Sequence, residues 1–241
     1  MNFYNIRRFF LRNFIPEFIW PIYIYLDDVK FQIRKMPYSY GIKRMLVKNQ
    51  YECSERLLVN KYLRPSDSVI ELGSSIGILS KIIANKINLT SSLYCLEADE
   101  NLIQAAQETI NDCSNQNIHF FNGFFAFAVD QNTYVFDRSL GSLGGQLVKT
   151  DKKIGITIDD LNTLYNQKRM KANFLICDIE GSEESLLIKN SKIPLTIKRL
   201  LIELHPHVYG TKVMDNIIRN IKSRDFKLVD KHGTNFYFEK K

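Results

Sequence analysis

The sequence predicts an α/β fold in which helices cover both faces of a mostly parallel sheet that ends in an antiparallel pair of strands. Short apolar runs of strand type alternate with segments whose apolar residues recur at helical spacing, as in parallel sheets joined by crossover helices. The chain has 241 residues, 45% of them hydrophobic, which is enough for one sizeable core. The last two strand candidates are separated by a short turn around Gly233. Because that turn has no room for a crossover helix, the two strands must run antiparallel.

Seven strands are expected, in chain order, at residues 68–72, 93–97, 118–121, 174–178, 200–204, 227–230 and 236–239. Helices are expected at 76–87 and 101–113, with right-handed crossovers. Residues 124–136 are expected to form a small hairpin that turns at 130–132, followed by a mobile loop at 139–145. Ligands of such sheets bind at the carboxyl ends of the strands, so we expect the chemistry there, beside the strand at 68–72.

Basic charge is concentrated in the first quarter of the chain. Residues 1–64 hold 12 Lys and Arg against 5 Asp and Glu, which accounts for the whole net charge of +7. Within residues 1–26 the bases are interleaved with aromatic side chains. We therefore predict an N-terminal extension, residues 1–50, ahead of a single domain, residues 51–241.

Three interpretations of residues 1–26 remain open. Their aromatic side chains pack onto the domain, or they contact a membrane surface, or they bind nucleic acid, which is the partner we least expect. A signal peptide or a membrane span is not expected. The apolar run is interrupted by Arg12, Pro16, Glu17 and Pro21 and is shorter than the roughly 20 residues that a span requires.

The four cysteines are scattered along the chain without a C-x-x-C pair: Cys53, Cys95, Cys113 and Cys177. Two of them fall inside predicted core strands, where cysteine behaves as a small hydrophobe. This pattern indicates reduced thiols. We expect a cytoplasmic protein, with peripheral membrane attachment through residues 1–26 as the alternative.

The most informative segment is the strand, turn and helix at residues 69–87. Gly73 allows a sharp turn at the end of the strand, and Gly77 allows the following helix to approach the sheet closely. Glu97 ends the next strand, 24 residues after Gly73, where a carboxylate that accepts both hydroxyls of a ribose is expected. These features predict a cofactor site.

The cofactor is not expected to be a dinucleotide. The order Gly73-Ser-Ser-Ile-Gly77 has serine at its centre and lacks the third glycine of a pyrophosphate-binding loop. Glu71 would repel a phosphate, whereas it can accept a hydrogen bond from the amino group of S-adenosylmethionine. S-adenosylmethionine is therefore the predicted cofactor.

Three further segments carry a resemblance to a known family. Residues 154–161 read I-G-I-T-I-D-D-L, residues 173–183 contain D-x-E-G-x-E from Asp178 to Glu183, and residues 199–205 read R-L-L-I-E-L-H. Together they resemble the FkbM-type family of S-adenosylmethionine-dependent methyltransferases over residues 50–238. The chain departs from the family pattern at Glu71, where aspartate is usual, and at Ser74 and Ser75, which replace Ala-Asn.

The resemblance implies a class I methyltransferase-like, Rossmann-like sheet of seven strands and O-methylation of a hydroxyl, most often on a sugar of a glycan or polysaccharide. An RNA methyltransferase and a nonenzymatic S-adenosylmethionine-binding module are the alternatives. No N-P-P-Y-like run follows the fourth strand, so methylation of an amine or a base is not suggested.

The expected site residues follow the ends of the first five strands. The predicted cofactor contacts are Glu71, Gly73, Ser74, Ser75, Gly77, Glu97, Ala98, Asn122, Gly123 and Asp178. Asp178, Glu180 and His205 are the predicted catalytic residues, because a hydroxyl acceptor has to lose its proton. Asp178, Glu203 and His205 are alternatively the ligands of Mg²⁺ or Mn²⁺ that lowers the acceptor pKa. Glu183 and Glu184 are expected in the first turn of the next helix, where negative charge suits the helix dipole.

Overall fold

A computed structural model describes residues 20–34, 36, 38–125, 134–137, 146–149, 157–158, 161–184, 186–187 and 193–241. The chain divides into two compact units, Met1–Cys53 and Ser54–Lys241. None of the helices in the described part of the chain has the length and apolarity that crossing a bilayer requires.

In the first unit, an antiparallel hairpin precedes a helix. The hairpin pairs β1 (Tyr23–Leu26) with β2 (Val29–Gln32), and α2 (Tyr40–Val47) follows. Its two-residue turn consists of Asp27 and Asp28, both at positive φ, as tight hairpin turns with the twist of the strands require. None of these three elements was predicted from the sequence.

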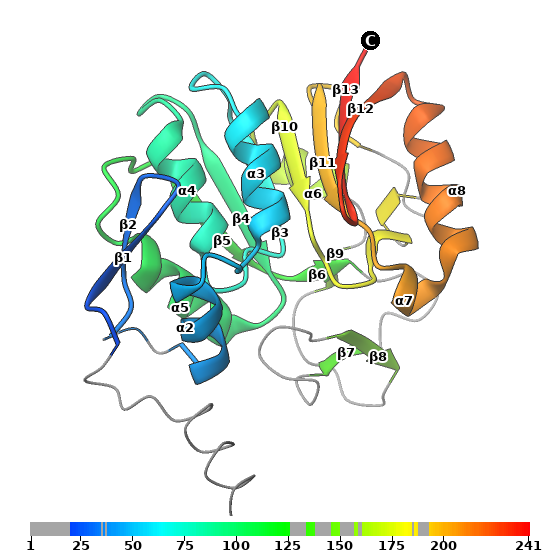
Figure 1. Cartoon of the computed structure of the whole chain (residues 1–241). Coiled ribbons are helices and arrows are strands. Elements are labelled where there is room, and N and C mark those ends of the chain that lie inside the picture. Colours follow the sequence, from blue (N-terminus) through cyan, green and yellow to red (C-terminus); the bar gives the residue numbers. More distant parts are fainter. Residues whose placement is uncertain are drawn as a thin grey trace, which may run out of the picture. The chain divides into compact units, whose positions relative to one another are not determined.

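The second unit is built on a seven-stranded sheet with the order β12-β13-β11-β10-β3-β4-β5. The strands are β3 (Val69–Leu72), β4 (Leu93–Glu97), β5 (Ile118–Asn122), β10 (Phe174–Cys177), β11 (Arg199–Glu203), β12 (Phe226–His232) and β13 (Asn235–Lys240). Five are parallel, and β13 runs antiparallel to both β11 and β12. This is the sheet of the class I methyltransferase fold, which confirms the predicted fold class and the C-terminal hairpin (Figure 1).

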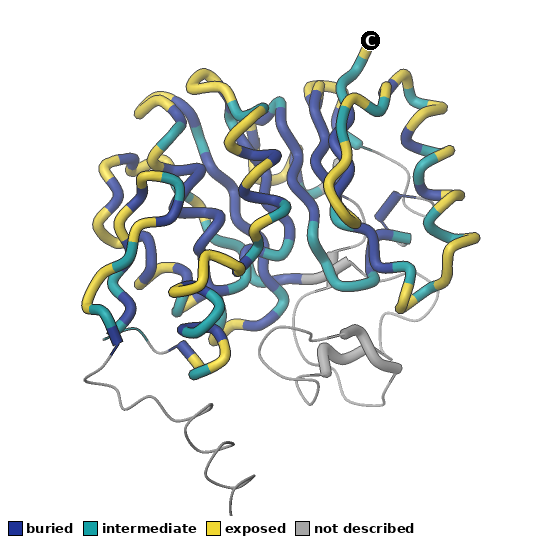
Figure 2. Tube along the Cα trace, viewed as in Figure 1, coloured by how far each residue is buried: buried dark blue, intermediate teal, exposed yellow. Residues whose placement is uncertain are grey.

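Helices cover both faces of this sheet. They are α3 (Cys53–Tyr62), α4 (Ile78–Lys86), α5 (Glu100–Ile110), α6 (Leu161–Gln167), α7 (Pro206–Tyr209) and α8 (Thr211–Lys222). One core contains residues of α3, α4 and α5, such as Leu58 and Ile83, and the other contains residues of α6 and α8, such as Tyr165 and Ile217. The sheet is thus covered on both sides, and its central strands are buried along their whole length (Figure 2).

Burial on both faces explains why the central strands are continuous apolar runs. Side chains of a strand alternate between the two faces, so Ile70 and Leu72 enter one core and Val69 enters the other. Glu71 shares the face of Val69, which is the face covered by α4. The direction of the Glu71 side chain follows from this alternation.

The predicted hairpin at 124–136 is wrong. Its first half, β6 (Phe124–Phe125), pairs in parallel with β9 (Thr157–Ile158), and β7 (Tyr134–Asp137) pairs antiparallel with β8 (Gln146–Lys149). The segment that pairs with a short strand is decided by tertiary contacts, which the local pattern does not contain. The predicted turn and the predicted loop at 139–145 lie outside the described residues.

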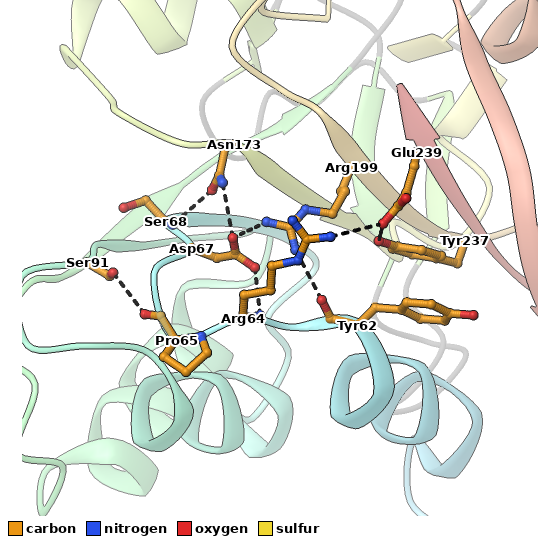
Figure 3. A network of polar contacts seen from close by, with 10 residues as sticks. All are labelled: Tyr62, Arg64, Pro65, Asp67, Ser68, Ser91, Asn173, Arg199, Tyr237 and Glu239. Atoms are coloured by element: carbon orange, nitrogen blue, oxygen red, sulfur yellow. Dashed lines mark hydrogen bonds and ion pairs between the residues drawn. The ribbon is translucent and has the colours of Figure 1, made fainter. Parts of the chain in front are cut away.

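The strands of the central sheet are tied together at their amino ends by a buried polar network (Figure 3). The carboxylate of Asp67, just before β3, accepts hydrogen bonds from the guanidinium of Arg199 in β11 and from Nδ2 of Asn173, just before β10. Arg199 also donates to the backbone oxygen of Tyr62 in α3 at 3.1 Å. The ion pair and the hydrogen bond from Asn173 therefore join β3, β10 and β11 at the end of the sheet opposite the predicted site.

Candidate functional site

Gly73 stands where two strand ends come into contact. Its φ is +86°, and its N–H donates to the backbone oxygen of Leu96 at 2.8 Å. A Cβ at this position would lie 1.6 Å from the backbone oxygen of Asp178. Only glycine fits, so the loop after β3 lies directly against the backbone that follows β10.

Gly77 was predicted to let the following helix approach the sheet, but it lies against another helix instead. It caps the N-terminus of α4 with a φ of +79°. A Cβ there would lie 2.8 Å from Cα of Ala106 in α5. The close neighbour is thus the adjacent helix rather than the sheet.

Glu97 joins the glycine loop to the loop after β4. Its Oε2 accepts a hydrogen bond from the N–H of Ser75 and its Oε1 from the N–H of Asp99, both at 2.9 Å. Burial raises the pKa of Glu97, while these backbone hydrogen bonds act in the opposite direction. Ser75 itself has a φ of +47°, which is uncommon for a residue with a side chain.

The predicted residues at the end of β5, Asn122 and Gly123, lie beside the same loop. Nδ2 of Asn122 donates to the backbone oxygens of Glu97 and Ala98, both at 3.1 Å. The N–H of Gly123 donates to the backbone oxygen of Glu97 at 3.0 Å. The ends of β4 and β5 therefore form one surface, as expected for neighbouring parallel strands.

The carboxyl of Glu71 lies between the sheet and α4. Its Oε2 accepts a hydrogen bond from Oγ of Ser80 at 2.6 Å, and Sγ of Cys95 lies 3.5 Å away. Burial raises the pKa of Glu71 to about 8, an effect that the hydrogen bond from Ser80 reduces. Glu71 therefore faces a helix layer.

Ser74, in contrast, presents an unused polar atom. The residue is buried, and within the described part of the chain its Oγ has no hydrogen-bond partner. A buried hydroxyl without a partner is costly, so its presence needs an explanation. A polar ligand at the glycine loop would supply one.

A second group of side chains lies at the ends of β10 and β11. Nε2 of His205 is 3.4 Å from Oδ1 of Asp178 and 3.5 Å from Oε2 of Glu180. One potential ligand atom each from Asp178, Glu203 and His205 lies within 4.8 Å of the others. The structure therefore brings Asp178, which was predicted to lie by the methionine end of the cofactor, together with Glu180, Glu203 and His205, which were predicted to face the acceptor.

This group has an excess of negative charge. Burial, and after it the charge of Glu203, raises the pKa of Asp178 well above its ordinary range. Burial alone would lower the pKa of His205, but Glu183, Asp178 and Glu180 outweigh it and raise that pKa to about 9. The arrangement favours a proton or another cation between His205 and the carboxylates.

Glu183 is the residue that sequence reasoning missed. It begins a helical turn, as predicted, but its side chain is fully buried. Oε1 lies 3.0 Å from Nδ1 of His205 and accepts hydrogen bonds from the N–H groups of Ile179 and Gly181, both at 3.3 Å. The D-x-E-G-x-E run contains this glutamate, but strand and helix periodicity does not give the direction of its side chain.

The sheet order and the glycine loop thus define a class I methyltransferase-like, Rossmann-like fold. No family model and no curated protein sequence matches the chain. Among solved structures, it is similar to fibrillarin from Aeropyrum pernix with natively bound S-adenosyl-L-methionine, at 11% identity and a TM-score of 0.44 over 73% of this chain and 67% of that one. It is similar to the ribosomal protein L11 methylase from Lactobacillus delbrueckii subsp. bulgaricus, at 10% identity and a TM-score of 0.47 over 80% of each chain. It is also similar to a methyltransferase from Pyrococcus furiosus, at 13% identity and a TM-score of 0.42 over 87% of this chain and 89% of that one. With identities this low, the similarity concerns the fold alone.

Proposed function

We propose that the chain is an S-adenosylmethionine-dependent methyltransferase whose domain comprises residues 51–241 and whose acceptor is a hydroxyl, on a sugar of a glycan or polysaccharide. The observation that carries the proposal is the contact between Gly73 and the backbone of Asp178. It sets a cofactor-type glycine loop directly beside a cluster of three carboxylates and a histidine. The choice of a sugar hydroxyl is supported by the resemblance to the FkbM-type family.

The glycine loop and its neighbours would hold the cofactor. The carboxylate of Glu97 lies at the end of β4, where it can accept hydrogen bonds from ribose hydroxyls while keeping its two backbone bonds. The buried Oγ of Ser74 is available to the polar end of the methionine part. Asn122 and Gly123 would border the base. In this proposal Glu71 contributes indirectly: its carboxyl already accepts a hydrogen bond from Ser80, and it thereby helps to position α4.

The proposed chemistry requires alignment and removal of one proton. S-adenosylmethionine supplies a methyl group on a good leaving group, so the protein has to position the acceptor oxygen in line and deprotonate it. Glu180 and His205 are the two candidate bases. Glu180 is partly exposed, and burial raises its pKa. Asp178 lies between the cofactor loop and these bases, where it can orient the acceptor.

A second form of the proposal places a divalent cation between Asp178, Glu203 and His205. The spacing of their ligand atoms and the excess of negative charge favour it. Two carboxylates and an imidazole suit Mn²⁺, and Mg²⁺ to a lesser degree. Such a cation lowers the pKa of a hydroxyl bound to it.

Mn²⁺ binding followed by electron paramagnetic resonance tests the cation form without a substrate. Glu203→Gln and His205→Asn are expected to weaken binding at least tenfold, and Asp215→Asn, an exposed position on α8, is the control. Equal affinities in all four proteins would remove the cation from the proposal.

Calorimetric titration with S-adenosylmethionine, S-adenosylhomocysteine and NAD, with and without Mg²⁺, tests the cofactor. Binding of the first two and not of NAD is expected. Glu97→Ala should weaken that binding, whereas Glu108→Ala, exposed on α5, should not. If neither S-adenosylmethionine nor S-adenosylhomocysteine binds, the methyltransferase proposal is overturned. If the dissociation constant is unaltered in Glu97→Ala, Glu97 does not hold the ribose.

The acceptor class and the partner of residues 1–26 need separate measurements. RNA bound through phosphates would be released steeply as salt is raised, and vesicles with anionic lipid would retain a protein that lies on the membrane surface. We expect no binding to RNA and none to anionic vesicles. In the acceptor assay, we expect methyl transfer to at least one member of a panel of oligosaccharides. Methyl transfer to RNA and not to any sugar would reverse this assignment.

A further inference from the structure

We propose that Glu183 is a positioning residue that keeps the proton of the neutral His205 ring on Nδ1, so that Nε2 is the nitrogen that faces the acceptor. The catalytic consequence of this inference rests on the proposed function. The inference adds Glu183, a residue that contacts His205 and not the acceptor itself. It applies equally to a base and to a cation ligand, since both require a lone pair on Nε2.

The hydrogen-bond geometry around Glu183 leaves one assignment for the ring. Its Oε1 accepts hydrogen bonds from two backbone N–H groups at 3.3 Å and lies 3.0 Å from Nδ1 of His205. An oxygen that already accepts hydrogen bonds from two backbone N–H groups acts as the acceptor in the third contact as well. The hydrogen of the Nδ1 contact therefore belongs to His205.

The backbone on both sides of the contact is also fixed. The N–H of His205 donates to the hydroxyl of Tyr209 at 2.7 Å, at the start of α7. On the other side, a Cβ at Gly181 would lie 2.7 Å from Cγ1 of Val208, so the turn that carries Glu183 packs tightly on α7. Because the side chain of His205 is also buried, neither partner can turn without moving the other.

The consequence appears at the opposite side of the ring. With Nδ1 held by Glu183, Nε2 points toward Oδ1 of Asp178 and Oε2 of Glu180. Second partners of this kind fix the tautomer and orientation of a functional histidine, and their loss typically lowers metal affinity or activity 10- to 100-fold. We expect a loss of about that size in kcat for Glu183→Leu, with the dissociation constant of S-adenosylmethionine unchanged.

Nitrogen-15 NMR of the imidazole rings tests the assignment directly. The chain has four histidines, and the signals that disappear in His205→Asn identify His205. The spectra are recorded above about pH 10, because the surrounding carboxylates raise the pKa of His205 to about 9 and the ring is neutral only above that value. In the wild type and in Glu183→Gln, whose amide oxygen still accepts, Nδ1 should then carry the proton. In Glu183→Leu the proton should move to Nε2, whereas Glu108→Gln should match the wild type.

A wild-type ring protonated on Nε2 would overturn the inference, and so would a Glu183→Leu variant with an unchanged tautomer. If Glu183→Leu does not fold, the wild-type and Glu183→Gln spectra still decide. Failure of S-adenosylmethionine to bind would refute the proposed function while leaving the tautomer result intact, so the two failures are distinguishable.

Discussion

Glu71 gives the sharpest prediction about stability. Its carboxyl is buried between β3 and α4 with a pKa near 8, whereas an unfolded chain would return it to about 4.5. Between these two values the folded protein holds a proton that the unfolded chain releases. The unfolding free energy of the wild type should therefore fall as the pH rises from about 4.5 to about 8. Above about pH 8, Glu71 should cause no further change.

The size of this effect follows from the pKa difference. One proton held only by the folded state lowers the free energy of unfolding by about 1.4 kcal/mol per pH unit. Between pH 5 and pH 8 the loss would approach about 4 kcal/mol, and relaxation around a buried acid makes this an upper bound. Glu71→Gln has no proton to lose there, so this part of the slope should vanish. The unpaired amide of Gln shifts the stability by a pH-independent amount.

Urea denaturation at pH 5, 6, 7 and 8 measures the slope. The difference in unfolding free energy between Glu71→Gln and the wild type should move in favour of the variant by roughly 2–4 kcal/mol across this range. Asp215→Asn, exposed on α8, serves as the control and should follow the wild type. Parallel curves for Glu71→Gln and the wild type would mean that Glu71 is ionised in the folded state, and the reasoning would fail.

Three other substitutions are expected to have distinct effects. Asp178→Ala should lower turnover at least about 100-fold, because it removes the carboxylate. The melting temperature should not change, because the backbone oxygen stays against Gly73. Unchanged turnover would exclude a catalytic role of Asp178. Gly73→Ala should destabilise the fold by at least about 2 kcal/mol in urea titrations, because its Cβ has no space, whereas Gly41→Ala should not; equal stability of the two variants would contradict this. Arg199→Met should cost about 3–5 kcal/mol of unfolding free energy, because Asp67 stays buried without its cation, and a loss below about 1 kcal/mol would refute that account.

Strands buried on both faces were predicted best. The run at 93–97 coincides with β4, and the limits of the other six differ by one or two residues. Continuous apolar runs bounded by polar residues carry this information locally. The hairpin and the helix of the first unit were not predicted, because residues 1–50 were interpreted as an extension, although Leu26, Val29 and Phe31 face one side of the hairpin and are buried.

The candidate site was predicted as a group of residues and less well as a set of contacts. The carboxyl ends of parallel strands share one edge, so Asp178, Glu203 and His205 could be placed together from their positions after β10 and β11. The buried contact between Glu183 and His205 depends on a turn with positive φ at Glu180 and Gly181. No periodicity in the sequence encodes the direction of a side chain in such a turn.

The polar network at the amino ends of β3, β10 and β11 has a consequence for how this chain can vary. The ion pair of Asp67 and Arg199, together with Asn173, joins three strands at one end of the sheet (Figure 3). A mutational scan that scores folding should therefore find that positions 67, 173 and 199 accept few replacements.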